Sequence, residues 1–281
     1  MGTRPGTGAD HSFDKVKHMR WQNFLAVLFC ALLVGHAPAR ASDVTDHWWA
    51  PLESGWGVSV TQQDDTAFIV FFVHGKNGEP TWFHGTGTRG GHDMEGNPFF
   101  SGPLYRTSGP WHGGPFDSSQ AQAVQVGTVI FEANAINRAV VEYTVDGVKT
   151  TKVVQRLTFR NRDWSGVYRG VVRANYRACA PEFVPAFIYD DGLVDVEHRG
   201  SAFTMWLDGK QAACMFTGTY TQHGRVGEVQ GNYTCADGPS GTFKLKDLET
   251  TRNTFGGRLE TTHPSCGSVT IDVAGFGLIS Y

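Results

Sequence analysis

Short apolar segments separated by turn-forming residue pairs recur along most of this chain, and this rhythm constrains the fold most strongly. The segment 68–73 (FIVFFV) is followed by Asn77-Gly78 and then by 80–83 (PTWF), and Asp146-Gly147 interrupts another apolar run. Asn-Gly or Asp-Gly between two apolar segments is the strongest short-range signal of a β-hairpin. We read 68–73 as a strand buried on both faces, because it is continuously apolar. With 35 glycines and only 18% charged residues, the chain is predicted to be all-β.

The strand rhythm occurs twice, and the polar segment 160–163 (RNRD) separates the two runs. We expect about seven or eight strands in the first run and eight or so in the second, where each turn is too short for a crossover connection. In the second run, turns are expected at Asp191-Gly192, Asp208-Gly209 and Asp237-Gly238, and in the first run 106–123 is expected to be a long loop. The sequence therefore predicts two small antiparallel β-barrels or β-sandwiches in tandem.

The N-terminal 41 residues have the features of a secretory signal peptide. Lys15, Lys17 and Arg20 precede the apolar run 24–34 (FLAVLFCALLV), and Ala39-Arg40-Ala41 follows it. This run is too short to span a bilayer, which needs roughly 20 apolar residues. We predict a signal peptide at 1–41 with cleavage after Ala41, and a periplasmic or secreted protein that is not embedded in a membrane.

The predicted mature chain divides into an aromatic-rich domain at 42–160 and a disulfide-bonded domain at 161–281. Residues 1–41 hold five Lys or Arg and two Asp or Glu, so their removal changes the formal net charge from −3 to −6. An acidic chain without a basic stripe does not suit nucleic acid as a partner.

Four cysteines remain after cleavage, and an even number in an exported chain indicates disulfides. Zinc is the alternative, but none of the pairs has the two-residue spacing of a zinc knuckle. If a hairpin is centred on 222–225, Cys214 and Cys235 face each other. Cys179 then pairs with Cys266, which joins the first and last strands of the second domain.

Several motifs resemble a family of exported proteobacterial β proteins with a W-W-x-P-x-E-S-G-W-G module and no characterised activity. This resemblance implies export and β architecture and supplies no catalytic residues. His74 departs from it, since the relatives are expected to have an aromatic or small residue there. The matching segments are 48–57, 61–63, 102–107, 109–110, 126–127 and 143–148 in the first half, and 164–166, 217–220, 231–235 and 237–238 in the second.

Five residues of the first domain form a candidate ligand site: Trp48, Trp49, Glu53, Trp56 and Trp82. Flat indole faces beside a carboxylate suit a sugar ring or another amphipathic small molecule. The alternative interpretation is structural, with the tryptophans closing the ends of a barrel.

Motifs of nucleophilic, zinc-protease and phosphate-binding sites do not occur, so no catalytic residue and no cofactor is assigned. A two-residue turn at Asn77-Gly78 would pair Phe71 with His84 and direct His74 and His84 to different places, so no metal site is predicted. We expect a non-catalytic exported protein that binds a glycan or another amphipathic ligand, or interacts with the cell envelope. The alternatives are a small secreted hydrolase with Glu53 or a histidine as acid/base, and a purely structural pair of barrels.

Overall fold

The structure is a computed structural model that describes Gly2 and residues 43–92, 98–179, 189–210, 212–236, 238–250, 254–263 and 266–277, with the backbone alone at some of them, 175–179 included. The predicted signal peptide and its cleavage site lie outside the described residues. Within the described residues, no helix has the length and apolar character needed to cross a membrane.

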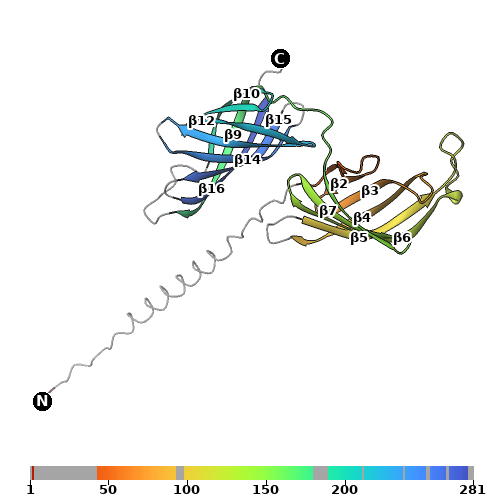
Figure 1. The fold of residues 1–281 in the computed structure, drawn as a ribbon. Coiled ribbons are helices and arrows are strands. Elements are labelled where there is room, and N and C mark those ends of the chain that lie inside the picture. The colour runs from red at the N-terminus through yellow and green to blue at the C-terminus, as the bar shows by residue number, and fades with distance from the viewer. Residues whose placement is uncertain are drawn as a thin grey trace. The chain divides into compact units, whose positions relative to one another are not determined.

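The chain folds into two closed antiparallel barrels of eight strands each, in tandem (Figure 1). The predicted all-β class is confirmed, and the first and last strands of each run pair with each other, which makes both units closed barrels and not sandwiches. Barrel 1 consists of Asp46–Trp49 (β1), Gly57–Gln63 (β2), Thr66–His74 (β3), Pro80–His92 (β4), Pro98–Ser108 (β5), Gln122–Ala135 (β6), Arg138–Val145 (β7) and Val148–Arg156 (β8).

Barrel 2 follows after a short linker, 157–165. Its strands are Gly166–Cys179 (β9), Tyr189–Arg199 (β10), Ala202–Gly209 (β11), Ala213–His223 (β12), Val226–Cys235 (β13), Ser240–Thr250 (β14), Thr254–His263 (β15) and Cys266–Gly277 (β16). Each barrel encloses its own apolar core, built around Trp48, Phe71 and Phe131 in barrel 1 and around Trp164, Phe203 and Leu245 in barrel 2.

Strand β3 shows how the alternation of a sheet divides one apolar run between two environments. Ile69 and Phe71 are buried in the core, whereas Phe68 and Phe72 point outward and are exposed. The prediction of a strand buried on both faces is therefore wrong. Successive side chains of a strand face opposite sides, and in this barrel only the inner side is covered.

The hairpin between β3 and β4 also differs from the prediction. Its turn occupies 75–79, where the Gly75 N–H donates to the Glu79 carbonyl (2.8 Å) and the Gly78 N–H to the Gly75 carbonyl (2.9 Å). This moves the register by one residue, so that Phe71 pairs with Phe83. A slip of one residue moves every side chain to the other face. His84 consequently lies on the same outer face as His74, not on a different one.

In barrel 2, Asp191-Gly192 is not a turn but lies inside β10. Gly192 pairs with Gly209 on β11, and a Cβ atom on Gly192 would collide with the Asp208 carbonyl oxygen. Gly192 therefore allows the two strand backbones to approach closely, which is one reason for a glycine inside a strand.

The β12–β13 hairpin has the predicted register, with Cys214 opposite Cys235. The Cys214–Cys235 disulfide is present, with an Sγ–Sγ distance of 2.01 Å. Cys266 is also disulfide-bonded, and it pairs in register with Cys179 across β16 and β9. The side chain of Cys179 lies outside the described part, so the Cys179–Cys266 bond stays a prediction that the register supports.

Turns of an up-and-down barrel alternate between its two ends. In barrel 1, the connections 50–56, 75–79, 109–121 and 146–147 share one end, which we call the distal end. At the other end lie the residues before β1, the β2–β3 and β6–β7 turns and the start of the linker. We call this the joint end, because barrel 2 contacts it.

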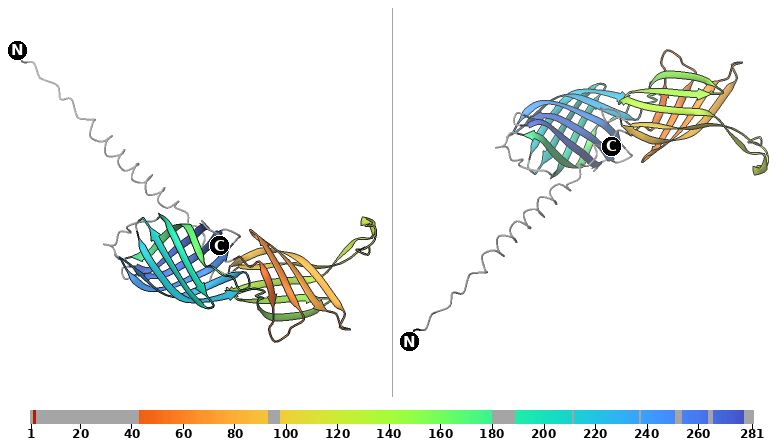
Figure 2. Two further views of the ribbon diagram at one scale, coloured as in Figure 1. Left: turned by 90° about the horizontal axis from the view of Figure 1, so that it is seen from above. Right: turned by 90° about the horizontal axis from the view of Figure 1, so that it is seen from below.

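An arm extends from the distal end of barrel 1 (Figure 2). On β5, the pairing with β4 ends at Tyr105, and on β6, the pairing with β7 ends at Gly127. Towards the distal tip, β5 and β6 stay paired with each other as far as Ser108 and Gln122. We define the arm as residues 106–125. The predicted long loop is thus a two-stranded ribbon with a shorter loop at its tip, which contains a 3-10 turn at Ser118–Gln120.

Candidate functional site

The structure does not bring the five predicted ligand residues together. Trp48 is buried inside barrel 1, where its indole N–H donates to the Val44 carbonyl (3.0 Å) and its ring contacts Phe131 edge-on (5.3 Å). Trp49 follows it on the strand and points to the opposite, outer side, where it is half-buried. Trp82 lies on β4, also on the outer side, and is half exposed. Trp48 therefore has a position in the core, as the structural interpretation of the tryptophans expects.

Glu53 and Trp56 do form a cluster, at the distal end of barrel 1. The Trp56 indole N–H donates to Glu53 Oε2 (3.1 Å), and the same oxygen accepts from Lys152 Nζ (2.6 Å). Lys152 Nζ also lies 5.7 Å from the centre of the Trp56 ring. The hydrogen bond from Lys152 holds the pKa of Glu53 below its ordinary value. A lowered pKa does not suit a general acid, which needs a proton to give near neutral pH.

A second group of rings forms a continuous outer surface on β3, β4 and β5, which we call the aromatic face. The Trp82 and His84 rings are stacked (centroids 5.7 Å apart), Phe68 lies 5.5 Å from His84, and Tyr105 lies 6.3 Å from it. Phe72 is the register partner of Trp82. The aromatic face thus consists of Phe68, Phe72, Trp82, His84 and Tyr105.

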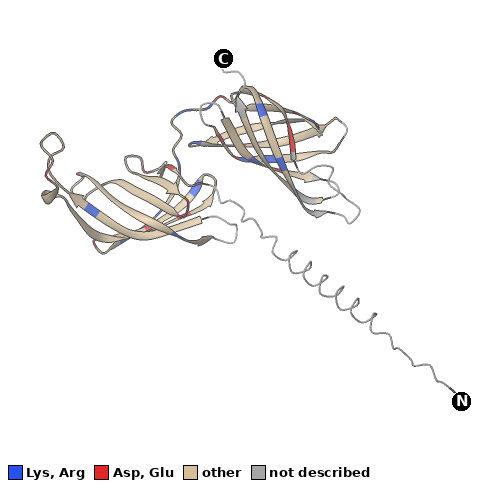
Figure 3. Cartoon of the chain, turned by 180° about the vertical axis from the view of Figure 1, so that it is seen from behind, with Lys and Arg blue, Asp and Glu red and all other residues tan. Residues whose placement is uncertain are grey.

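The aromatic face is solvent-exposed to an unusual degree for rings of this size. Phe68, Phe72 and Trp82 are 45%, 56% and 48% exposed. Side chains with hydroxyl groups surround them, because register places Thr61 and Thr86 beside Phe68, and the Thr88–Ser101 pair follows on the next row. Rings flanked by hydroxyl groups offer stacking and hydrogen bonding on one surface. In Figure 3, most of the ribbon of the strands is tan, the colour of residues other than Lys, Arg, Asp and Glu.

Sequence reasoning found only Trp82 of this face. Phe68 and Phe72 were hidden in the run assigned to a doubly buried strand, and His84 was placed by a register that is off by one residue. The alternation expected for a barrel strand was the signal that could have identified Phe68 and Phe72 as outward-facing.

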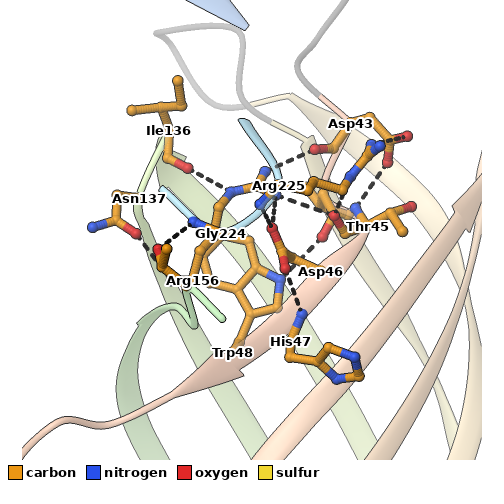
Figure 4. Close-up of polar contacts among 12 residues, drawn as sticks. Asp43, Thr45, Asp46, His47, Trp48, Ile136, Asn137, Arg156, Gly224 and Arg225 are labelled. Carbon is orange, nitrogen blue, oxygen red and sulfur yellow. Dashed lines mark hydrogen bonds and ion pairs between the residues drawn. The ribbon is translucent and has the colours of Figure 1, made fainter. Parts of the chain in front are cut away.

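A polar network at the joint end holds the two barrels together (Figure 4). The Arg156 guanidinium is almost fully buried and pairs with Asp46 (Nη1–Oδ2, 3.1 Å). It also donates to the carbonyls of Ile136 (2.7 Å), Asp43 (2.7 Å) and Thr45 (3.1 Å), and its Cζ lies 4.6 Å from the centre of the Trp48 ring. Burial lowers the pKa of Arg156, and the charge of Asp46 opposes this effect.

Barrel 2 enters this network through the tip of its β12–β13 hairpin. The Arg225 N–H donates to Asp46 Oδ2 (2.9 Å), and the Arg225 guanidinium pairs with Asp43 (2.6 Å) and Glu249 (3.2 Å). The Gly224 N–H donates to the hydroxyl of Thr158 in the linker (2.9 Å). The N-terminal segment, the linker and a hairpin of barrel 2 are therefore fastened at one place, which we call the joint.

The linker itself is held by Gln222. Its side-chain amide donates to the Arg160 carbonyl (2.9 Å), and its side-chain oxygen accepts from the Arg162 N–H (2.7 Å). These contacts order the polar segment that separates the two strand runs in the sequence.

The titratable groups of the joint have structural partners and do not resemble a catalytic pair. Burial raises the pKa of Glu249, and Arg225 opposes this rise from 3.2 Å away. Burial lowers the pKa of His223. Among the described residues, three or more His, Cys, Asp or Glu side chains do not gather in a group that could hold a metal ion.

Gly224 provides a test of the joint. Its φ of +59° is left-handed, and a Cβ atom there would collide with the Asp46 carboxylate, whereas Gly200 has a φ of +63° and open space around it. Gly224→Ala and Gly200→Ala should each lower the free energy of unfolding by about 1–2 kcal/mol, because alanine is strained in the left-handed region. Only Gly224→Ala should open the joint, which we expect to accelerate proteolysis within 157–165 several-fold.

Time courses of limited proteolysis, with fragments identified by mass spectrometry, measure this difference. Equal cleavage of the two variants within the linker would show that the hairpin tip does not hold the barrels together.

Comparisons with known proteins assign no family, since neither a protein-family model nor a curated protein matches the chain.

Proposed function

We propose that this chain is an exported, non-catalytic binding protein whose aromatic face holds an amphipathic ligand of the glycan class. The observation that carries the proposal is the exposure of Phe68, Phe72 and Trp82, about half of each, in one surface with His84 and Tyr105. Apolar surface of this extent is costly to leave in water, and on soluble proteins it commonly marks a binding surface.

The position of these rings supports a role in binding rather than in folding. Barrel 1 already fills its interior with the inward side chains of the same strands, such as Ile69, Phe71 and Phe83. The outward rings therefore add nothing to that core. Flat rings bordered by hydroxyl groups match a sugar, which has apolar C–H faces and polar edges.

Export is supported by two independent features. The signal-peptide pattern at 1–41 predicts it, and the Cys214–Cys235 disulfide is typical of an oxidising compartment. The resemblance of 48–57 to exported proteobacterial β proteins agrees with both. A periplasmic or secreted location follows as part of the proposal.

The hydrolase alternative has less support. Its candidate acid, Glu53, is ion-paired with Lys152 and has a lowered pKa. A catalytic carboxyl group acting as an acid usually has a raised pKa and a partner in the same cleft. The carboxyl group of Glu249 has a raised pKa, but it belongs to the joint.

Binding of neutral oligosaccharides and peptidoglycan fragments to the mature chain, 42–281, tests the proposal by glycan array and then calorimetry. We expect the double variant Phe72→Ala/Trp82→Ala to weaken binding at least about tenfold, which corresponds to about 1.4 kcal/mol. Both side chains are half exposed, so the fold should be retained.

Trp206→Ala is the matched control, because Trp206 is a partly exposed tryptophan on β11 of barrel 2. Its affinity should equal that of the unmodified protein. If the double variant binds as tightly as the control, the aromatic face is not the binding surface. If the unmodified protein binds none of these glycans, the ligand class is wrong.

A further inference from the structure

The distal end of barrel 1 carries a second set of exposed apolar side chains, separate from the aromatic face. Leu52 is 99% exposed, Phe116 77%, Trp111 73%, Val148 66% and Val124 57%. We call these five residues the apolar rim. Single exposed apolar side chains are common on protein surfaces, but the concentration of five of them at one end of a barrel indicates an interaction surface.

Three separate connections supply the apolar rim. Leu52 comes from the β1–β2 connection, Trp111, Phe116 and Val124 from the arm, and Val148 from the start of β8, directly after the β7–β8 turn. The fourth connection at this end, 75–79, is polar and contains Lys76 and Glu79. The apolar groups therefore project from several tips and do not form one flat face.

Most of the charged groups beside the apolar rim are paired with a group of opposite charge. Glu53 pairs with Lys152 (2.6 Å), Arg106 with Asp146 (2.6 Å) and Lys149 with Glu142 (2.8 Å). In the loop of the arm, the Asp117 carboxylate accepts from the Ser119 N–H, the Ser119 hydroxyl and the Gln120 amide, which lowers its pKa. The Asp117 carboxylate, hydrogen-bonded to neutral groups, keeps its negative charge, so the distal end presents little net charge but is not neutral, whereas the predicted mature chain carries −6.

The backbone at the tip of the arm satisfies part of its own hydrogen bonding. The Gly114 N–H donates to the Trp111 carbonyl (3.1 Å). The Gln120 N–H donates to the backbone carbonyl of Asp117 (3.1 Å), and the Ala121 N–H donates to that of Ser118 (3.2 Å). Polar groups that are already paired are less costly to move out of water.

The projecting tips and the paired charges of the distal end favour a lipid surface over a protein as the partner. A rigid protein groove would have to match several projecting tips at once, whereas a fluid lipid layer adapts to them. Tryptophan and phenylalanine favour the boundary between headgroups and acyl chains. An acidic protein is repelled by anionic lipids, whereas a zwitterionic surface does not repel an end of the molecule on which most charges are paired.

We propose that the apolar rim docks barrel 1 peripherally on a zwitterionic phospholipid surface. Trp111 and Phe116 enter the headgroup layer first, because the arm projects beyond the barrel, and Leu52 and Val148 make the second contact. The joint with barrel 2 lies at the opposite end of barrel 1 and stays in water.

Co-flotation of the mature chain with phosphatidylcholine vesicles tests the proposal. The unmodified protein should float with the vesicles, and Trp111→Ala/Phe116→Ala should lower the partition coefficient at least about tenfold, because it removes the two rings that enter the headgroup layer first. Val153→Ala, which removes an exposed side chain from the wall of the same barrel, should not change it.

The remaining arms of the experiment separate other partners and the proposed ligand site. Phe72→Ala/Trp82→Ala should still float, because the aromatic face is a different surface, and Trp111→Ala/Phe116→Ala should keep any glycan affinity. The proposal is overturned if the unmodified protein stays with the soluble fraction, if it floats only with phosphatidylglycerol present, or if Trp111→Ala/Phe116→Ala floats equally well. Light scattering without vesicles provides a further check, since an oligomer that Trp111→Ala/Phe116→Ala dissociates would identify a second copy as the occupant instead.

Discussion

Replacement of Arg156 by alanine should lower the free energy of unfolding by about 3–5 kcal/mol, the usual cost of removing one partner of a buried ion pair. The variant leaves the Asp46 carboxylate buried without its guanidinium and removes the donor for the carbonyls of Asp43, Thr45 and Ile136. Calorimetric unfolding of the mature chain measures the loss, and we expect the transition of barrel 1 to move to lower temperature.

Arg106→Ala is the control for this prediction. Arg106 also pairs with an aspartate, Asp146, but both side chains are about half exposed. Exposed pairs of this kind contribute about 0–1 kcal/mol. If Arg156→Ala lowers the free energy of unfolding no more than Arg106→Ala does, water reaches the Arg156–Asp46 pair as readily as the exposed pair, and the prediction is wrong.

Replacement of Trp48 by alanine should also cost about 3–5 kcal/mol, because it leaves a large cavity among well-packed side chains. Trp49→Ala should cost clearly less, since Trp49 is half-buried on the outer side of the same strand. Thermal unfolding of the two variants, followed by circular dichroism, provides the comparison. The pair of neighbours therefore separates an inward from an outward tryptophan with almost the same sequence context.

Trp48→Ala also decides between the two interpretations of the tryptophan cluster. A stable variant with reduced ligand affinity would place Trp48 in the binding site, as one reading of the sequence predicts, and would contradict its position in the core. Trp48 and Arg156 are in contact, so the double variant should lose less stability than the two single losses combined.

The joint has a consequence for how the two barrels respond to a partner. Asp46 accepts from both Arg156 of barrel 1 and Arg225 of barrel 2, so one carboxylate participates in both halves of the network. We therefore expect the barrels to act as one body and not as beads on a flexible linker.

Local pattern determined much of the fold from the sequence alone. Apolar runs bounded by Asn-Gly and Asp-Gly pairs identified the strands, the short turns of the second run indicated its up-and-down order, and the centre of one hairpin placed Cys214 opposite Cys235. Each of these inferences depends on contacts between residues close in sequence, where turn chemistry and chain length leave few arrangements.

Only the tertiary structure decided which residues are brought together on a surface or at the joint. Closure of the barrel determines which side of 68–73 is covered, and the turn at 75–79 determines, through one residue of register, that His84 lies on the outer face beside Phe68 of β3. Asp46 and Arg156 are 110 residues apart, and Asp46 and Arg225 are 179 apart. No local pattern relates such residues, because their proximity arises from the closing of β1 onto β8 and from the docking of a hairpin of barrel 2 onto the joint end.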